Sequence, residues 1–176
     1  METQNFAKLA RNLEGNGMVL NNAAVGREQG RATLFEGESS ETAGFGAQGA
    51  PVEVAVISLD EYAQGTIDDT IDLLKIDTEG HELAVLEGTS HLIERGLVKH
   101  VLCECDFDPG RNEPHGNFQE LMAFLQPRNF RVVAFYCGGV DEVGWHWGDV
   151  LFRHSEPTRL EKPNPERISA PPFRTA

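Results

Sequence analysis

Basic residues, cysteines and long apolar runs are all scarce in this chain of 176 residues. No apolar stretch approaches the ~20 residues that cross a bilayer, and the polar start METQNFAKLARN lacks the apolar core of a signal peptide. Only 15 lysines and arginines face 28 acids, so the net charge is −13. This balance excludes nucleic acid as a partner, because a polyanion binder needs a positive surface. We expect a soluble protein with no direct membrane span.

The three cysteines do not suit a disulfide framework. Cys103 and Cys105 stand two apart in an apolar run and would face the same way on a strand, which leaves Cys137 over. This usage favours a reducing compartment, the cytoplasm or an organelle interior. The Cys-Glu-Cys run also lacks the spacing and the second ligand pair of zinc motifs. We therefore expect core thiols and no metal.

Strands and helices alternate along most of the chain. Apolar strands that alternate with helices predict a parallel sheet covered by helices on both faces. The tail 155–176 holds five of the nine prolines and is predicted to be extended. The apolar pattern predicts a first helix at 1–12, strands at 18–26, 31–35, 52–58, 71–76, 98–107, 131–136 and 149–153, and helices at 80–95 and 118–125.

The stretch GFGAQG, residues 44–49, matches the glycine pattern of dinucleotide-binding turns. Such a turn must lie between a strand and a helix, where backbone amides and the helix dipole meet the ligand. Here the glycines end a polar loop and lead into a strand. We therefore do not assign cofactor binding to this stretch.

The stretch KIDTEGHE, residues 75–82, places acids and a histidine where an apolar strand gives way to a helix. Helix capping by Asp77 or Thr78 explains acids at this point without any function. Ligand binding explains them too, because ligands of parallel α/β sheets sit beyond the carboxyl ends of strands. Capping does not account for Lys75. An unpaired buried ammonium is costly, so we expect Lys75 to pair with Glu104 or, failing that, with Asp77.

IDLLKIDTEGHELAVLEG resembles the signature of the FkbM methyltransferases, which use S-adenosylmethionine to methylate hydroxyl groups. NFAKLARNLEGNG with NNAAVG, VEVAVISLDEY and VLCECDF are similar to further family segments, and the resemblance covers residues 5–153. It implies a Rossmann-like class I methyltransferase fold, an α/β fold with a mostly parallel sheet and helices on both faces. This domain would span residues 1–154, and a Pro-rich extended tail would span residues 155–176.

The resemblance also implies roles for four residues. Asp77 or His81 would accept the proton of the substrate hydroxyl, while Glu79 and Glu104 would orient the substrate. S-adenosylmethionine would be the cofactor, and a sugar, lipid or polyketide hydroxyl the acceptor. The family's first two strands, its glycine-rich turn and its ribose-binding acid have no counterpart before residue 5. We therefore expect N-terminal truncation and weak or no cofactor binding.

Two functional hypotheses follow. In the first, the protein is an inactive methyltransferase relative that serves as a binding or scaffold subunit of a larger assembly. Partners would bind at the open edge Ile71–Ile76, unless strand 52–58 pairs there, and along the tail Pro157–Ala176. In the second, the gene product is an active O-methyltransferase whose cofactor-binding N-terminus is missing from the gene model.

Overall fold

The computed structural model describes residues 2–35, 50–64, 69–108, 110 and 115–155. Within these residues, no helix is both long and apolar enough to cross a membrane. Two predicted features, the GFGAQG stretch and the tail from residue 156, lie outside the described residues. In chain order the elements are α1 (Glu2–Asn12), β1 (Ala24–Val25), β2 (Gly30–Phe35), β3 (Pro51–Ile57), α2 (Leu59–Tyr62), β4 (Leu74–Ile76), α3 (Glu82–Glu87), α4 (Ser90–Glu94), β5 (His100–Asp106), β6 (Gly116–Asn117), α5 (Phe118–Leu125), a 3-10 turn η1 (Gln126–Arg128), β7 (Phe130–Val140) and β8 (Trp145–His154).

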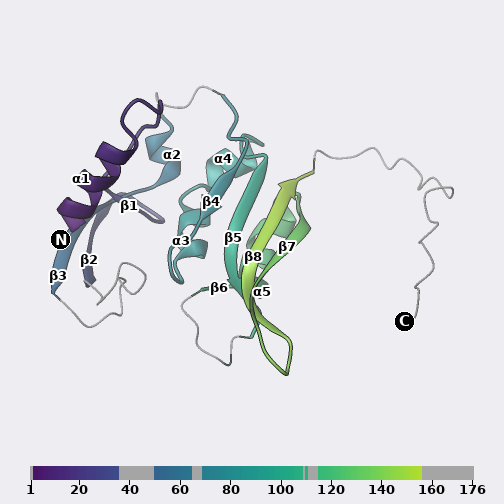
Figure 1. The fold of residues 1–176 in the computed structure, drawn as a ribbon. Coiled ribbons are helices and arrows are strands. Elements are labelled where there is room, and N and C mark those ends of the chain that lie inside the picture. Colours follow the sequence, from purple (N-terminus) through teal and green to yellow (C-terminus); the bar gives the residue numbers. More distant parts are fainter. Residues whose placement is uncertain (1, 36–49, 65–68, 109, 111–114, 156–176) are drawn as a thin grey trace.

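The strands form two separate sheets (Figure 1). The smaller sheet has the order β1-β3-β2, in which β3 runs parallel to β1 and antiparallel to β2. The larger sheet has the order β4-β5-β8-β7, with the short β6 beside β5. The predicted parallel pairing of segments 71–76 and 98–107 is confirmed, because Leu74 pairs with Val101 and Ile76 with Cys103.

The predicted fold class, a Rossmann-like class I fold with a mostly parallel sheet and helices on both faces, is wrong. Strand β8 pairs antiparallel with both β5 and β7, so the larger sheet is mixed. The cause is a tight turn between β7 and β8, closed by backbone hydrogen bonds in both directions between Asp141 and Gly144. Strands joined by so short a turn are antiparallel, because a parallel pair needs a long crossover.

The helices of the larger sheet, α3, α4 and α5, lie behind it in Figure 1. Alternate residues of β5 and β8 face these helices and are fully buried, because side chains alternate across a strand. Cys103 and Cys105 are among them as free thiols, which confirms the prediction of core thiols. The buried cluster comprises Ala63, Ile76, Val85, Leu86, Leu92, Ile93, Val98, Val101, Cys103, Cys105, Leu121, Leu125, Phe130, Val150 and Phe152.

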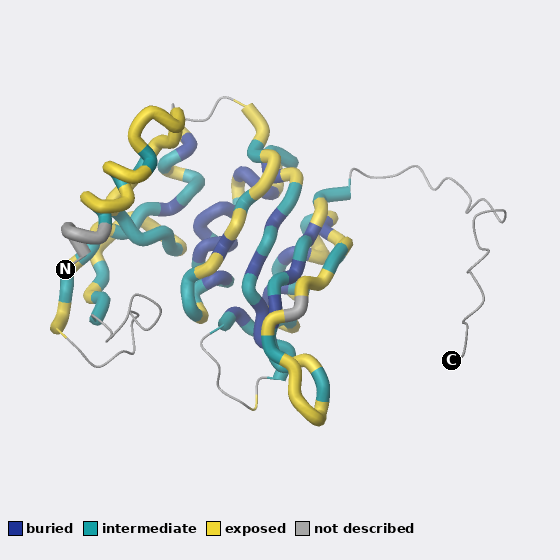
Figure 2. The backbone as a smooth tube through the Cα atoms, in the orientation of Figure 1, coloured by how far each residue is buried: buried dark blue, intermediate teal, exposed yellow. Residues whose placement is uncertain are grey.

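The opposite face of the larger sheet is open within the described residues. Leu73 and Tyr136 are 52% and 53% exposed, although both are large apolar or aromatic side chains. Lys75, the middle residue of β4, is also exposed, whereas its neighbour Ile76 is buried (Figure 2). The predicted cover of helices on this face is therefore not seen in the described part of the chain.

The predicted helix 80–95 is split into α3 and α4 at Gly88 and Thr89. A Cβ atom at Gly88 would collide with the carbonyl oxygen of Gly26, so the chain needs glycine there. The carboxylate of Asp60 accepts hydrogen bonds from the backbone N–H groups of His91 and Leu92 and so caps α4. These contacts fasten the smaller sheet and α2 to the helical layer.

Strand β4 is one of the two edge strands of the larger sheet. The alternative in which segment 52–58 pairs beside it is wrong, because β3 pairs with β1 and β2 instead. Among the described strands, only β5 pairs with β4. The second edge of β4 therefore has no partner strand in the described part of the chain.

Candidate functional site

A tight turn after β4 carries Glu79. Glu79 and Gly80 both have left-handed backbones, with φ of +51° and +93°. The Oε1 atom of Glu82 holds this turn by accepting hydrogen bonds from the N–H groups of Thr78, at 2.9 Å, and Gly80, at 3.3 Å. Glu82 itself is fully buried. Because a left-handed non-glycine residue costs about 1–3 kcal/mol, the buried carboxylate of Glu82 maintains a strained backbone that presents Glu79.

Glu104 projects from β5 toward the open face of the sheet, since its neighbours in sequence are the buried cysteines. Its side chain is only 15% exposed. Burial raises the pKa of this carboxyl group, which the charge of His115 opposes. The negative charges of Asp77 and Glu79 raise the pKa further, whereas Lys75 lowers it. Glu104 therefore lies in a partly dry, acidic environment.

His115 reaches the same place from the residue just before β6. Its Nδ1 atom lies 3.2 Å from Oε2 of Glu104, and its side chain is 11% exposed. The ring also contacts the indole of Trp147, with centroids 5.1 Å apart. The distance from Nδ1 to Oε2 is that of an ion pair, but the angles are not those of a hydrogen bond. Within the described residues, Nδ1 therefore has no hydrogen-bond partner.

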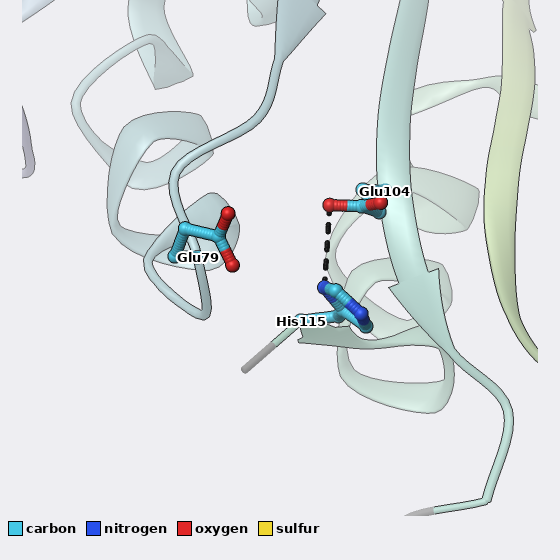
Figure 3. Close-up of side chains that lie close together, drawn as sticks. All are labelled: Glu79, Glu104 and His115. Atoms are coloured by element: carbon cyan, nitrogen blue, oxygen red, sulfur yellow. Dashed lines mark ion pairs between the residues drawn. The ribbon is translucent and has the colours of Figure 1, made fainter. Parts of the chain in front are cut away.

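Glu79, Glu104 and His115 face one another near the carboxyl end of β4, where the side chain of Glu104 projects from within β5 (Figure 3). One ligand atom from each of them lies within 4.8 Å of the others. The parallel pairing of β4 with β5 explains this meeting, because parallel strands end at the same edge of a sheet. Glu79 and Glu104 were both predicted from the sequence. His115 was not, because it comes from a third segment with no apolar periodicity around it.

The side chain of Glu82 contacts the backbone segments that carry Glu79 and His115. Its Oε1 atom holds the turn of Glu79, as described above, and its second oxygen lies against β6. A Cβ atom at Gly116, next to His115, would stand 2.8 Å from Oε2 of Glu82. The buried carboxylate therefore positions the backbone beside both Glu79 and His115.

Lys75 lies on the open face, and its predicted pairing with Glu104 needs correction. Its Nζ atom lies 2.7 Å from Asp149 and 3.4 Å from Asp77. Glu104 pairs with His115 instead, which leaves the fallback partner Asp77 as the correct part of the prediction. Burial lowers the pKa of Lys75, but the hydrogen bond and charge of Asp149, helped by Asp77, raise it overall.

The other two predicted site residues are not members of the three-residue cluster, although Asp77 acts on Glu104 as a nearby negative charge. Asp77 is half exposed and is engaged with Lys75. His81 occupies the position before α3, where its side chain makes no capping hydrogen bond. The predicted capping by Asp77 or Thr78 is likewise not found. Instead, the carboxylate of Glu82 accepts a hydrogen bond from the backbone N–H of Thr78. The roles predicted for Asp77 and His81 stay predictions.

The methyltransferase FkbM domain model matches residues 3–132 of the chain. This segment contains β4, β5, β6 and all three residues of the cluster. Neither the curated proteins nor the solved structures that were compared with the chain gave a match. Because the matched segment covers most of the sequence, the chain belongs to the FkbM methyltransferase domain family, whose members use S-adenosylmethionine.

Proposed function

We propose that this chain presents the acceptor side of an O-methyltransferase site and works as a subunit of a larger assembly. The observation that carries the proposal is the convergence of Glu79, which follows β4, with Glu104 of β5 and His115, which precedes β6. Ligands of open α/β sheets lie beyond the carboxyl ends of strands such as β4. The proposal concerns a hydroxyl-bearing substrate, in keeping with the family's chemistry.

The cluster suits the acceptor half of methyl transfer to a hydroxyl group. Such a reaction is a displacement that depends on positioning and on a group that takes up the hydroxyl proton. Glu104 and His115 lie in contact and form one proton-accepting unit. Glu79 faces them from the neighbouring strand end and orients the acceptor by accepting a hydrogen bond from a second hydroxyl.

The described residues do not fit a whole S-adenosylmethionine molecule. Ligands of this size bury most of their surface in a concave site, yet β4 is an edge strand and bounds the site on one side. A wall on the outer side of β4 would have to come from a further polypeptide segment. We therefore propose that the described part of the chain does not turn the cofactor over by itself.

The outer edge of β4 supports the proposed partner. A strand edge offers unpaired N–H and C=O groups that favour pairing with another extended segment. The adjoining Leu73 is more than half exposed, so a paired segment would also cover apolar surface. The tail Pro157–Ala176 lies outside the described residues, and its predicted role as a second contact stays a prediction.

Calorimetry, a methyl-transfer assay and amide hydrogen exchange test the subunit role. Calorimetric titration with S-adenosylmethionine should give weak heat or none, and labelled methyl groups should not pass to sugar, lipid or polyketide alcohols. Micromolar binding together with turnover would replace the subunit by an independently active enzyme. Amide hydrogen exchange tests the open edge: the outward amides of β4 should exchange fast in the free chain and slow down in the assembly. Slow exchange of these amides in a monomer would remove the case for a partner.

The acceptor role is tested in whichever form of the protein transfers methyl groups. Glu104→Gln and His115→Gln should each lower turnover by about 100-fold or more, the scale of a lost proton acceptor. His91→Gln is the matched control, because His91 also lies beside a carboxylate, that of Asp60, but outside the cluster. Equal losses in the control would show that the cluster is not the site.

A further inference from the structure

We propose that Glu79, Glu104 and His115 bind one divalent transition-metal ion, of the Zn²⁺ or Mn²⁺ class. The inference concerns a ligand that neither the family match nor the sequence assigns. No metal was expected from the sequence, because the Cys-Glu-Cys run lacks the spacing of zinc motifs. The cluster uses none of the cysteines, and His115 was not associated with the acids before the fold was known.

The ligand atoms of the three residues match a transition-metal ion in type and spacing. Two carboxylates and one imidazole form a mixed oxygen and nitrogen set, which suits Zn²⁺ and Mn²⁺ better than Mg²⁺ or Ca²⁺, whose protein ligands are almost all oxygens. Ligand atoms at about 2.1 Å from a tetrahedral ion lie about 3.4 Å apart. Nδ1 of His115 and Oε2 of Glu104 are already 3.2 Å apart, and the Glu79 oxygen lies within 4.8 Å of both ligand atoms. A movement of at most about 1.4 Å by the Glu79 carboxylate, which lies in a loop, would complete the site.

The state of His115 supports a bound ion. Its Nδ1 atom is buried and makes no hydrogen bond within the described residues, although it faces the two carboxylates. A buried polar nitrogen without a hydrogen bond is costly, of the order of 1–3 kcal/mol. A metal ion at the centre of the cluster would use the lone pair of this nitrogen and remove that cost.

The negative charge around Glu104 also favours a bound cation. Asp77 and Glu79 both act on Glu104 as neighbouring negative charges, and the contact with His115 balances them only when that ring is protonated. Lys75, which lies close to this group, is committed to Asp149 and Asp77. A divalent cation would neutralise the two carboxylates of the cluster at once.

Three protein ligands leave coordination positions open, as in catalytic rather than structural metal sites. If the proposed function holds, an oxygen of the acceptor alcohol could occupy such a position, and the ion would favour transfer of the hydroxyl proton to the oxygen of Glu104 that does not bind the ion. That consequence rests on the proposed function, whereas the cation site itself does not.

The test uses the full chain after removal of any affinity tag and after stripping with a chelator that is then dialysed away. Titration with Zn²⁺ alone, followed by calorimetry, should show one ion per chain. Co²⁺ alone should develop visible absorption bands typical of mixed nitrogen and oxygen ligation. Glu79→Gln, Glu104→Gln and His115→Gln should each weaken Zn²⁺ binding at least about tenfold, since each removes one of three ligands. Mg²⁺ and Ca²⁺ should compete poorly.

His91→Gln is the control, because it removes an exposed imidazole that lies beside only one carboxylate. It should bind Zn²⁺ as the unchanged chain does. Unchanged affinity in all three cluster variants, less than one ion per chain, or equal loss in the control would each overturn the proposal. If His115→Gln does not fold, Glu79→Gln decides alone, because Glu79 lies in a turn outside the core. Zn²⁺ binding to the chain together with no methyl transfer by its assembly would keep the site and reject the proposed function, and methyl transfer by an assembly whose chain binds no Zn²⁺ would do the reverse.

Discussion

Lys75 and Asp149 form an ion pair across the intervening strand β5, with Nζ 2.7 Å from Oδ1. The pair links the edge strand β4 to β8 over the open face of the sheet. Both side chains are more than a third exposed, so solvent weakens the attraction. A double-mutant cycle with Lys75→Met and Asp149→Asn, measured by urea unfolding, should therefore give a coupling of about 0.2–1 kcal/mol. A coupling several times larger would show that the pair is drier than its exposure indicates.

Glu82 offers a prediction about the turn beneath the cluster. Only its Oε1 atom accepts hydrogen bonds, and Oε2 has no hydrogen-bond partner in the described residues. Glu82→Gln keeps one carbonyl oxygen for the turn and should change the free energy of unfolding little. Glu82→Ala leaves the backbone N–H groups of Thr78 and Gly80 without their acceptor and should lower the free energy of unfolding by about 1–3 kcal/mol. Thermal unfolding of the two variants compares them directly, and equal losses would contradict the assigned role.

Backbone strain at Glu79 gives a second stability test. Its φ of +51° is one that glycine adopts freely and other residues do not. Glu79→Gly should therefore be more stable than Glu79→Ala by about 1 kcal/mol, although both lose the carboxylate. Urea unfolding of the pair measures the difference. A more stable alanine variant would show that this turn is relaxed in solution.

The junction between the two sheets depends on a residue without a side chain. A Cβ atom at Gly88 would collide with the carbonyl oxygen of Gly26, whereas a Cβ atom at Gly30 would enter open space. Gly88→Ala should destabilise the protein by about 1–3 kcal/mol through overpacking. The control Gly30→Ala should stay within about 0.5 kcal/mol of the unchanged chain. Calorimetric melting temperatures check both, and a tolerated Gly88→Ala would mean that the junction is loose.

The buried thiols predict that the free energy of unfolding falls at alkaline pH. Burial raises the pKa of Cys105 to about 12 and also raises the pKa of Cys103 well above its ordinary value. Because the unfolded thiols ionise near pH 9 while the folded ones stay protonated, the unfolded state gains stability as pH rises from about 9 to about 12. The free energy of unfolding should fall over that window, and Cys105→Ala should reduce its slope. A slope unchanged by this substitution would contradict the assignment.

Local sequence signals predicted the elements around the site well, and they failed at long range. Helix 118–125 is found at the predicted residues, because Asn117 caps it and accepts hydrogen bonds from Gln119 and Glu120. The pairing of β4 with β5 also follows from the sequence. The antiparallel β8 does not follow from the alternation of helices and strands. Its signal was the short turn at Asp141–Gly144, which indicates a hairpin.

The site was half predictable for a related reason. Glu79 follows an apolar strand and Glu104 lies near the end of another, positions that sequence patterns reveal. His115 belongs to no regular pattern, and only the pairing of β6 with the end of β5 brings it to Glu104. The break of helix 80–95 at Gly88 was equally hidden, because its cause is the approach of Gly26 from a different part of the chain.

The position of β8 between β5 and β7 has a consequence for biosynthesis. β5 is synthesised before residues 107–144, and until β8 follows, the edge of β5 away from β4 has no paired strand. The nascent chain therefore carries an apolar strand that waits for a late partner, a state prone to aggregation. A fragment cut at the end of the family match, residue 132, would be held permanently in that state. The smallest fragment that can mature thus extends to His154, beyond the segment by which the family is recognised.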